Sequence, residues 1–267
     1  MNEYLLLLGK GAVQGLTEFL PISSSGHLVL YDYFFNPKKS MERTEDVFID
    51  ILLHIGTLLA TCIVFRESIQ KSLSSFFHPS TWKTEESNLW KMILISLIPT
   101  GIIGLLIEKN LLTYVRHPFW VGLFLVINGF ILWSTRASRS TTESVLTWKL
   151  AFCIGVVQGI AALPGISRSG STISCALWLL LPRKTAGEFS FLISIPAIAG
   201  AIFLESLQIQ PSTIAWGPTL LGTVASFFFG LLFLKGLLRF IHQGKLFYFS
   251  FYCWLLGPAA ILFSYFY

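Results

Sequence analysis

Six long apolar stretches dominate the pattern of hydrophobic and polar positions along the chain. Several approach the roughly 20 residues that an α-helix needs to cross about 30 Å of hydrocarbon. A water-soluble protein with so many near-continuous apolar segments would expose large apolar patches and aggregate. We therefore predict an all-α polytopic membrane protein with about six full transmembrane helices. The stretches are 47–65, 89–107, 119–134, 189–204, 215–234 and 246–266.

Composition and charge agree with a membrane protein. Of 267 residues, 54% are hydrophobic and 12% are charged, whereas a soluble domain carries about 25% charged residues. The net charge of +5 comes from short loops between the apolar stretches, without a basic face that would bind nucleic acid. We therefore expect membrane lipids and no nucleic acid as partners. The four cysteines lack metal-ligand spacing, so no structural zinc or disulfide framework is expected.

Two polar segments of the chain repeat each other. Residues 11–27 read GAVQGLTEFLPISSSGH and residues 155–171 read GVVQGIAALPGISRSGS, with eight of seventeen positions identical and no gap. The identities are mostly small or polar residues, which indicates an internal duplication rather than shared hydrophobicity. We divide the single membrane domain, 1–267, into a first repeat at 1–135 and a second repeat at 149–267. Helix-breaking Gly and Pro at corresponding positions of two halves are typical of a binding site inside the membrane.

Loop charge predicts how the two segments enter the bilayer. The positive-inside rule places loops rich in Lys and Arg in the cytoplasm and the 205–215 loop, which has none, outside. Segment 150–181 then starts and ends on the cytoplasmic side, and 4–35 starts and ends outside. Both are therefore expected to be re-entrant helix–loop–helix hairpins of an inverted-topology repeat, although the basic 36–46 loop disagrees with its place outside. The cytoplasmic loops are 135–149, 182–188 and 235–245.

The first polar segment carries an acid, three hydroxyls and an imidazole. Gln14 and Glu18 are spaced i, i+4 and share a helix face, and an ionised carboxylate in an apolar segment is usually functional. The hydroxyls and the imidazole that follow can supply a nucleophile, a base and phosphate hydrogen bonds. Alone, the serines could be a turn and the histidine a packed core residue, but their combination with Glu18 favours a site. The candidates are Gln14, Glu18, Ser23, Ser24, Ser25 and His27.

The second polar segment has a cation where the first has a hydroxyl. Arg168 stands at the position that matches Ser24, between Ser167 and Ser169 and shortly before Thr172. A guanidinium binds phosphate oxygens bidentately, and hydroxyls and N–H groups at a helix start add donors. The alternative is an arginine that extends to the membrane surface. Because the copies are complementary, we predict that they meet as one asymmetric phosphate site.

Two further polar pairs are secondary candidates. Asp50 and His54 are spaced i, i+4 at the start of an apolar stretch, and Glu188 lies close to Ser190 after the second polar segment. For both pairs, a role in orienting neighbouring segments is at least as well supported as a role in chemistry.

The two polar segments resemble the undecaprenyl-diphosphatase family, also known as bacitracin-resistance proteins. The resemblance depends on QGLTEFLPISSSGH at 14–27 and PGISRSGST at 164–172, with support from DILLHIGTLLA at 50–60 and EFSFLISIPA at 188–197. It implies hydrolysis of undecaprenyl diphosphate to undecaprenyl phosphate and inorganic phosphate, which recycles the lipid carrier of cell-wall synthesis and confers bacitracin resistance. It also implies the bacterial inner membrane, with the site open to the periplasmic side.

The resemblance assigns roles to several residues. Gln14 and Glu18 match an (E/Q)-x-x-x-E motif, so a Mg or Ca ion is implied with Glu18 as a ligand; because Gln14 stands where the family often has Glu, Glu18 carries more of that role. Ser24 matches the family's nucleophile, which either attacks phosphorus directly or positions the attacking water. The expected catalytic residues are Glu18, Ser24, His27 and Arg168, and the expected substrate-binding residues are Gln14, Ser23, Ser25, Ser167, Ser169 and Thr172.

Two other functions are compatible with this architecture. Inverted repeats with broken helices are typical of transporters, so a membrane transporter or lipid flippase is the main alternative. An inactive membrane scaffold is a second alternative, but it predicts no clustered ionisable residues at matching repeat positions. The asymmetric arrangement of acid, hydroxyl and cation favours hydrolysis, because transport does not need it. A homodimer is kept as a candidate assembly.

Overall fold

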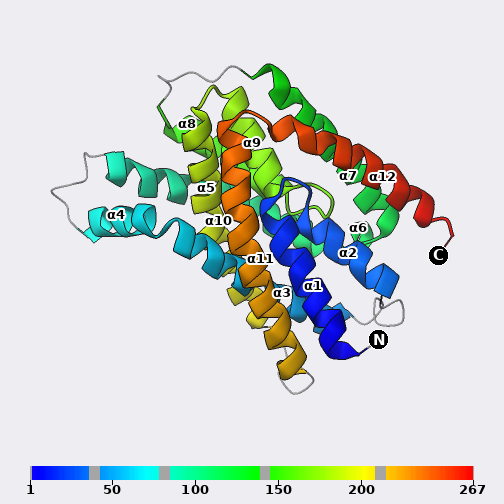
Figure 1. Cartoon of the computed structure of the whole chain (residues 1–267). Coiled ribbons are helices and arrows are strands. Elements are labelled where there is room, and N and C mark those ends of the chain that lie inside the picture. The colour runs from blue at the N-terminus through cyan, green and yellow to red at the C-terminus, as the bar shows by residue number, and fades with distance from the viewer. Residues whose placement is uncertain (1, 36–42, 78–84, 139–144, 208–214, 267) are drawn as a thin grey trace.

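The protein is helical throughout the parts of the chain that the structure describes. The computed structural model describes residues 2–35, 43–77, 85–138, 145–207 and 215–266, and no strand occurs among them. Figure 1 shows these helices packed around a common centre, with α4 and the start of α5 projecting to one side and α7 and α12 to the other. The α-helices are α1 Glu3–Phe19, α2 Ser24–Phe35, α3 Arg43–Val64, α4 Arg66–Phe77, α5 Glu85–Asn110, α6 Leu112–Val115, α7 Pro118–Ser134, α8 Trp148–Ile160, α9 Arg168–Trp178, α10 Arg183–Ser206, α11 Trp216–His242 and α12 Phe249–Phe263.

The number of long apolar helices confirms the predicted polytopic membrane protein. Among the described residues, five helical segments are long and apolar enough to cross a membrane, in α5, α7, α10, α11 and the segment that ends with α12. The pair α3 and α4 passes the same test together but bends by 78°, and would make the count six. Two predicted loops are wrong in extent. Helix α10 already begins at Arg183, directly after Pro182, and α11 continues to His242, because the Lys, Leu and Arg residues there are good helix formers.

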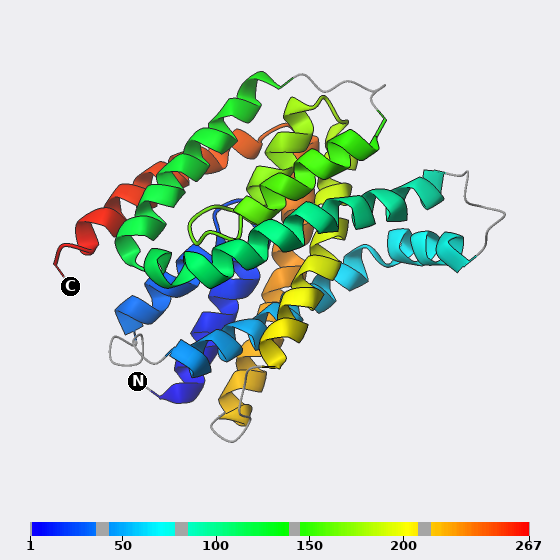
Figure 2. The ribbon, with the colours of Figure 1, turned by 180° about the vertical axis from the view of Figure 1, so that it is seen from behind.

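Both polar segments form a helix, a turn and a second helix. In the first, α1 ends before Pro21, and the chain turns through Ser23, whose φ of 70° lies in the left-handed region. In the second, α8 ends before Pro164, and Gly165 has a φ of 105°. Neither proline can continue its helix, so each segment breaks in the middle of the bundle. Figure 2 shows α1 rising from the lower end and α8 descending from the upper end, so that the two turns meet.

Each hairpin packs against a long helix of the opposite half. Helix α1 lies along α11 and α8 lies along α5. A Cβ atom on Gly11 would lie 2.0 Å from the carbonyl oxygen of Gly222, and one on Gly155 would lie 2.2 Å from that of Ser96. Glycine at these two matching positions therefore permits backbone-to-backbone contact, as small residues do in membrane helix pairs. Each hairpin therefore packs against a helix of the other repeat, and the two hairpins enter from opposite ends. Both features agree with the predicted inverted repeat.

Candidate active site

The turns of the two hairpins contact each other directly. The Oγ of Ser23 accepts a hydrogen bond of 2.9 Å from the backbone N–H of Gly165. A Cβ atom on Gly26 would lie 3.0 Å from the nitrogen of Gly165, and one on Gly170 would lie 3.0 Å from Cβ of Pro21. Gly26 and Gly170 are equivalent in the two repeats, and so are Pro21 and Gly165. The same contact is thus made twice, and a side chain at either glycine would fit only if its neighbours shifted.

The side chain of Asn128 in α7 forms hydrogen bonds with both turns. Its Nδ2 donates to the carbonyl oxygen of Pro21 at 2.8 Å, and its Oδ1 accepts from the N–H of Ser167 at 3.0 Å. The Oγ of Ser169 donates to the carbonyl oxygen of Phe19 at 3.0 Å, which adds a second link between the hairpins. Irregular backbone at membrane depth is tolerated only where such partners satisfy its polar groups. The turns are therefore fixed by side chains from the opposite repeat and from α7.

The carboxylate of Glu18 contacts polar side chains from both repeats. Glu18 is 8% exposed at the end of α1. Its Oε1 accepts from Nη2 of Arg168 at 2.5 Å, and its Oε2 accepts from Oγ of Ser24 at 2.6 Å and from Nε2 of Gln14 at 3.1 Å. Ser24 and Arg168 are the first residues of α2 and α9, where unpaired N–H groups favour bound anions. An acid, a hydroxyl and a guanidinium thus meet at two helix starts.

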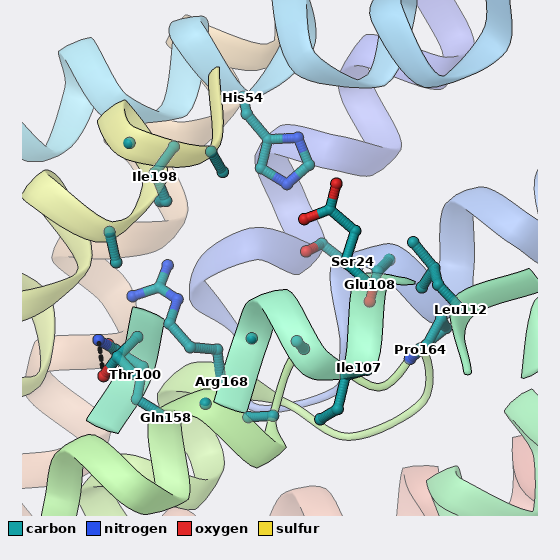
Figure 3. Close-up of a pocket in the computed structure, with 18 of the residues that line it drawn as sticks. Ser24, His54, Thr100, Ile107, Glu108, Leu112, Gln158, Pro164, Arg168 and Ile198 are labelled. Atoms are coloured by element: carbon teal, nitrogen blue, oxygen red, sulfur yellow. Dashed lines mark hydrogen bonds between the residues drawn. The ribbon is translucent and has the colours of Figure 1, made fainter. Parts of the chain in front are cut away.

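His54 of α3 approaches the same carboxylate from another side. Its Nε2 lies 3.5 Å from Oε2 of Glu18, and its Nδ1 lies 2.7 Å from the carbonyl oxygen of Asp50. Because a carbonyl can only accept, the Nδ1 carries a proton and the ring orientation is fixed. Figure 3 shows His54 and Arg168 reaching into one pocket from different elements. His54 was only a secondary candidate in the sequence, where nothing placed it beside Glu18.

The groups around Glu18 line a cavity of about 550 Å³. The hairpin turns form its polar end, and α3, α5 and α10 supply the other walls. Farther along the cavity lie three more carboxylates and a second arginine. The predicted residues that line it are Glu18, Ser23, Ser24, Ser25, Ser167 and Arg168, and the additional charged residues are Asp50, Glu108, Glu205 and Arg116.

His27 does not lie in this cavity with Glu18, contrary to the expectation that it acts there. Its Nδ1 lies 2.7 Å from the carbonyl oxygen of Ser23, and its Nε2 lies 2.7 Å from the hydroxyl of Tyr252. The ring stacks on Tyr252 with 5.7 Å between centroids. Nε2 and the ring therefore hold α2 against α12, and Nδ1 is engaged by the turn before α2. The sequence showed that His27 is close to Ser24 along the chain, but not which face of α2 it occupies.

Three predicted substrate-binding residues support the site from behind. Gln14 is fully buried and contacts Glu18, and the Oγ of Ser169 is occupied by the other hairpin. The Oγ1 of Thr172 donates to the carbonyl oxygen of Arg168 at 2.8 Å and lies 2.5 Å from Oγ of Ser190. These side chains position Glu18 and Arg168. The structure brings them to the site without placing them on the cavity wall.

A buried charge network beside the site was missed. Lys10 is 1% exposed, and its Nζ lies 2.9 Å from a carboxylate oxygen of Asp32 and 2.7 Å from one of Asp50. Asp50 also pairs with Arg116 at 3.0 Å. The signal was present in the sequence, because Lys10 precedes Glu18 by two helical turns on one face of α1. Asp50 thus joins Lys10 of α1 to Arg116, contacts that suit the orienting role considered for it.

The other secondary pair is structural, and the described residues contain no protein-only metal cage. Glu188 accepts a hydrogen bond from Ser68 of α4, which links α10 to the bent pair of helices α3 and α4.

In the part of the chain that the structure describes, no three His, Cys, Asp or Glu side chains converge in a way that could hold a metal ion. Glu18 remains the carboxylate closest to Ser24, with the buried Oε1 of Gln14 lacking a hydrogen-bond partner among the described residues.

Comparison with known proteins matches the chain over both hairpins and the long helices. The model of the bacitracin resistance protein BacA family matches residues 7–259. The chain belongs to the BacA family. An undecaprenyl-diphosphatase of Desulfatibacillum aliphaticivorans is 41% identical to it over 97% of this chain and 98% of that protein. Proteins of the same name from Halothermothrix orenii and Methanosphaera stadtmanae are 38% and 36% identical, each over at least 97% of both chains. The matched residues include Glu18 and all the side chains that contact it, Gln14, Ser24, His54 and Arg168.

Proposed function

We propose that this BacA-family protein hydrolyses undecaprenyl diphosphate to undecaprenyl phosphate and inorganic phosphate. The meeting of Ser24, Glu18 and Arg168 at one end of a membrane-embedded cavity carries the proposal. A hydroxyl that donates to a carboxylate is the arrangement of an activated nucleophile, and a guanidinium binds phosphoryl oxygens. The names of the relatives support the same substrate. The product would return to the lipid-carrier pool of cell-wall synthesis, which accounts for bacitracin resistance.

The proposed reaction begins with the terminal phosphoryl group beside Arg168. Glu18 accepts the proton of the Ser24 hydroxyl, and Oγ of Ser24 attacks phosphorus as the anhydride P–O bond breaks and undecaprenyl phosphate leaves. Water then attacks the seryl phosphate, Glu18 returns its proton to Oγ of Ser24 as the seryl P–O bond breaks, and inorganic phosphate departs. In the alternative route Ser24 orients a water that attacks phosphorus directly, with Glu18 again taking the proton. Both routes depend on positioning and charge stabilisation, which dominate phosphoryl transfer.

Glu18 rather than His27 is the proposed proton acceptor. The 2.6 Å hydrogen bond from Ser24 reaches Oε2 of Glu18 directly, within the distance a general base needs. His27 contacts Ser23 and Tyr252 instead. The ion pair with Arg168 also keeps the Glu18 carboxylate oriented toward the hydroxyl. This assignment revises the expectation that the imidazole of His27 supplies the base.

A divalent cation, Mg²⁺ or Ca²⁺, is proposed to accompany the substrate. The cavity holds four carboxylates and two arginines, so an added diphosphate would bring further negative charge without a matching cation. Glu18 lines the cavity and would hold the ion, with Gln14 orienting its carboxylate, and Mg²⁺ commonly takes one or two carboxylates plus substrate phosphates and water. Such an ion would supply neutralisation of the phosphoryl oxygens. Orientation and proton transfer remain with Arg168, Ser24 and Glu18.

The proposed setting is the bacterial inner membrane, with the site open to the periplasmic side. Loop charge supports this orientation, because the basic loops 135–149, 182–188 and 235–245 belong to the opposite side, although the basic 36–46 loop disagrees. The many exposed apolar side chains of the long helices suit contact with membrane lipids. A homodimer is the proposed assembly to test, by mass measurement of the protein in detergent.

Phosphate release tests the proposed function. Purified protein in mixed micelles is supplied with undecaprenyl diphosphate, with and without a chelator, and inorganic phosphate is measured. We expect release that falls on chelation, and losses of about 10²-fold or more in Ser24→Ala and Arg168→Ala. Ser206→Ala and Arg239→Ala, both outside the cavity lining, serve as matched controls. Normal turnover by both site variants, or no release by the natural protein, would contradict the proposal.

The hairpins that enter from opposite ends also favour a second candidate, transport of the lipid across the bilayer. Opposed broken helices of this kind surround the substrate site of many transporters. Proteoliposomes with labelled undecaprenyl phosphate in one leaflet distinguish the two functions. Movement of label that is unaffected by Ser24→Ala, in a protein that releases no phosphate from undecaprenyl diphosphate, would favour a flippase over a hydrolase.

A further inference from the structure

The cavity continues from Arg168 along a wall of small residues between α5 and α10. Gly101 and Gly104 of α5 and Ala197, Gly200 and Ala201 of α10 line it. A Cβ atom built on any of the three glycines meets no atom within 4 Å. These glycines differ from those of the hairpins, where an added Cβ would strike backbone. Helix packing within the described part of the chain therefore does not require glycine at the wall.

Glycine in the interior of a helix is less stable than alanine, because it loses more backbone freedom on folding. Three glycines at one wall, without a packing requirement, indicate that open space is what the positions provide. Gly101 and Gly200 are exposed, so the cavity opens sideways at this wall. Both α5 and α10 are candidate membrane spans, and an opening between two spans faces hydrocarbon rather than water.

A second observation indicates a bound molecule at the polar end of this wall. Gln158 lines the cavity and is 4% exposed, and its Nε2 donates to Oγ1 of Thr100 at 3.2 Å. Thr100 uses its own proton on a backbone carbonyl, of Ser96 or Gly155, so its Oγ1 can only accept from the amide. This fixes the orientation of Gln158, and its buried Oε1 has no partner among the described residues. An orphaned acceptor of this kind is costly unless a hydrogen-bond donor reaches it, and a water or a protonated oxygen of a diphosphate held at Arg168 would be such a donor.

We propose that the gap between α5 and α10 at Gly101, Gly104 and Gly200 is the portal through which a polyprenyl chain passes from the cavity into the bilayer. The inference depends on the proposed function, because it takes the substrate to be a prenyl diphosphate with its phosphates at Arg168. A cavity of about 550 Å³ suits a drug-sized ligand, so most of an undecaprenyl chain lies outside it. The small residues of the wall set the width of the exit and hence the chain length that is accepted.

Substrates of two lengths test the portal. Gly101→Leu, Gly104→Leu and Gly200→Leu are assayed for phosphate release from undecaprenyl diphosphate and from isopentenyl diphosphate, whose chain is short enough to stay inside the cavity. We expect kcat/KM for the long substrate to fall by about tenfold or more, since a side chain that narrows an apolar site discriminates by that amount. The value for the short substrate is expected to stay within about twofold.

Gly236→Leu is the matched control. Gly236 of α11 also has nothing within 4 Å of an added Cβ, and it is not among the residues that line the cavity. It is expected to leave both substrates unaffected. If a leucine variant does not fold, the alanine variant at the same position replaces it, with a smaller loss for the long substrate only.

Equal losses for both substrates, or unchanged turnover of the long one, would overturn the portal while the proposed hydrolysis stands. Failure of the natural protein to release phosphate from either substrate would refute the proposed function, and the portal with it. The two failures are therefore distinguished by the natural protein alone.

Discussion

Nη2 of Arg168 lies 2.5 Å from Oε1 of Glu18, and this ion pair joins residues 150 positions apart in the chain. Each partner comes from a different repeat, at the point where the repeats have diverged. The Glu18 carboxylate contacts the phosphate-binding cation through Oε1 and the Ser24 hydroxyl through Oε2, so all three groups meet at one place. Divergence of a duplicated segment has thus produced one asymmetric site from two similar hairpins.

Replacement of Arg168 by lysine tests whether the guanidinium shape matters. Arg168→Lys keeps the charge but loses the planar fork, so we expect kcat/KM for prenyl diphosphate hydrolysis to fall by about 10- to 100-fold. Arg183→Lys, at the start of α10 and outside the cavity lining, is the control. Full activity of Arg168→Lys would show that only the positive charge is needed.

His54 is expected to affect turnover more than stability. Its Nε2 lies 3.5 Å from Oε2 of Glu18, so His54→Leu removes a polar neighbour of the reacting groups, and we expect kcat to fall by about tenfold. His54→Gln keeps a polar side chain at this place and should recover part of the loss. A wild-type kcat for both variants would exclude His54 from the site.

Tyr252→Phe tests the position of His27. The substitution removes only the hydroxyl that contacts Nε2 of His27. We expect the free energy of unfolding to fall by about 1 kcal/mol, the contribution of one hydrogen bond. Phosphate release should stay close to that of the natural protein. Thermal unfolding and phosphate release are measured on the same sample. A large loss of phosphate release without a loss of stability would show that His27 takes part in the reaction.

Lys10 is expected to be essential for stability. Lys10→Met removes the buried cation that lies between the carboxylates of Asp32 and Asp50, and breaking a buried ion pair costs about 3–5 kcal/mol. Adding Asp32→Asn to Lys10→Met should recover part of that loss, since it neutralises one of the two carboxylates that lose this cation. Denaturant unfolding in detergent measures both. Equal stability of the natural protein and Lys10→Met would show that the network contributes nothing.

Replacement by alanine is expected to change stability in opposite directions at two glycines, one in α8 and one in the helix α5 that packs against it. A Cβ on Gly155 would lie 2.2 Å from the carbonyl oxygen of Ser96, whereas one on Gly101 meets nothing within 4 Å. Gly155→Ala should therefore destabilise the protein by about 1–3 kcal/mol through overpacking. Gly101→Ala should stabilise it by up to about 1 kcal/mol. A destabilising effect of the same size at both positions would contradict the close packing of α8 against α5.

The sequence by itself determined the class of the protein and the identity of the two segments that meet. Length and apolarity of a stretch are sufficient to define a membrane span, because the hydrocarbon thickness sets the requirement. The duplication of residues 11–27 at 155–171 pointed to Glu18, Ser24 and Arg168, which the structure brings together. Span boundaries near 182–188 and 235–245 were wrong because helices continue past the apolar positions.

Only the tertiary structure decided which side chains face the cavity. His27 and Ser24 are neighbours in the sequence, yet His27 packs against Tyr252 and His54 approaches Glu18 from a different helix. The open wall at Gly101 and Gly200 is equally invisible in the sequence, where these residues look the same as the packed Gly11 and Gly155. The physical reason is that the rotation of a helix and its neighbours are set by long-range packing, whereas the sequence pattern reports only local periodicity and composition.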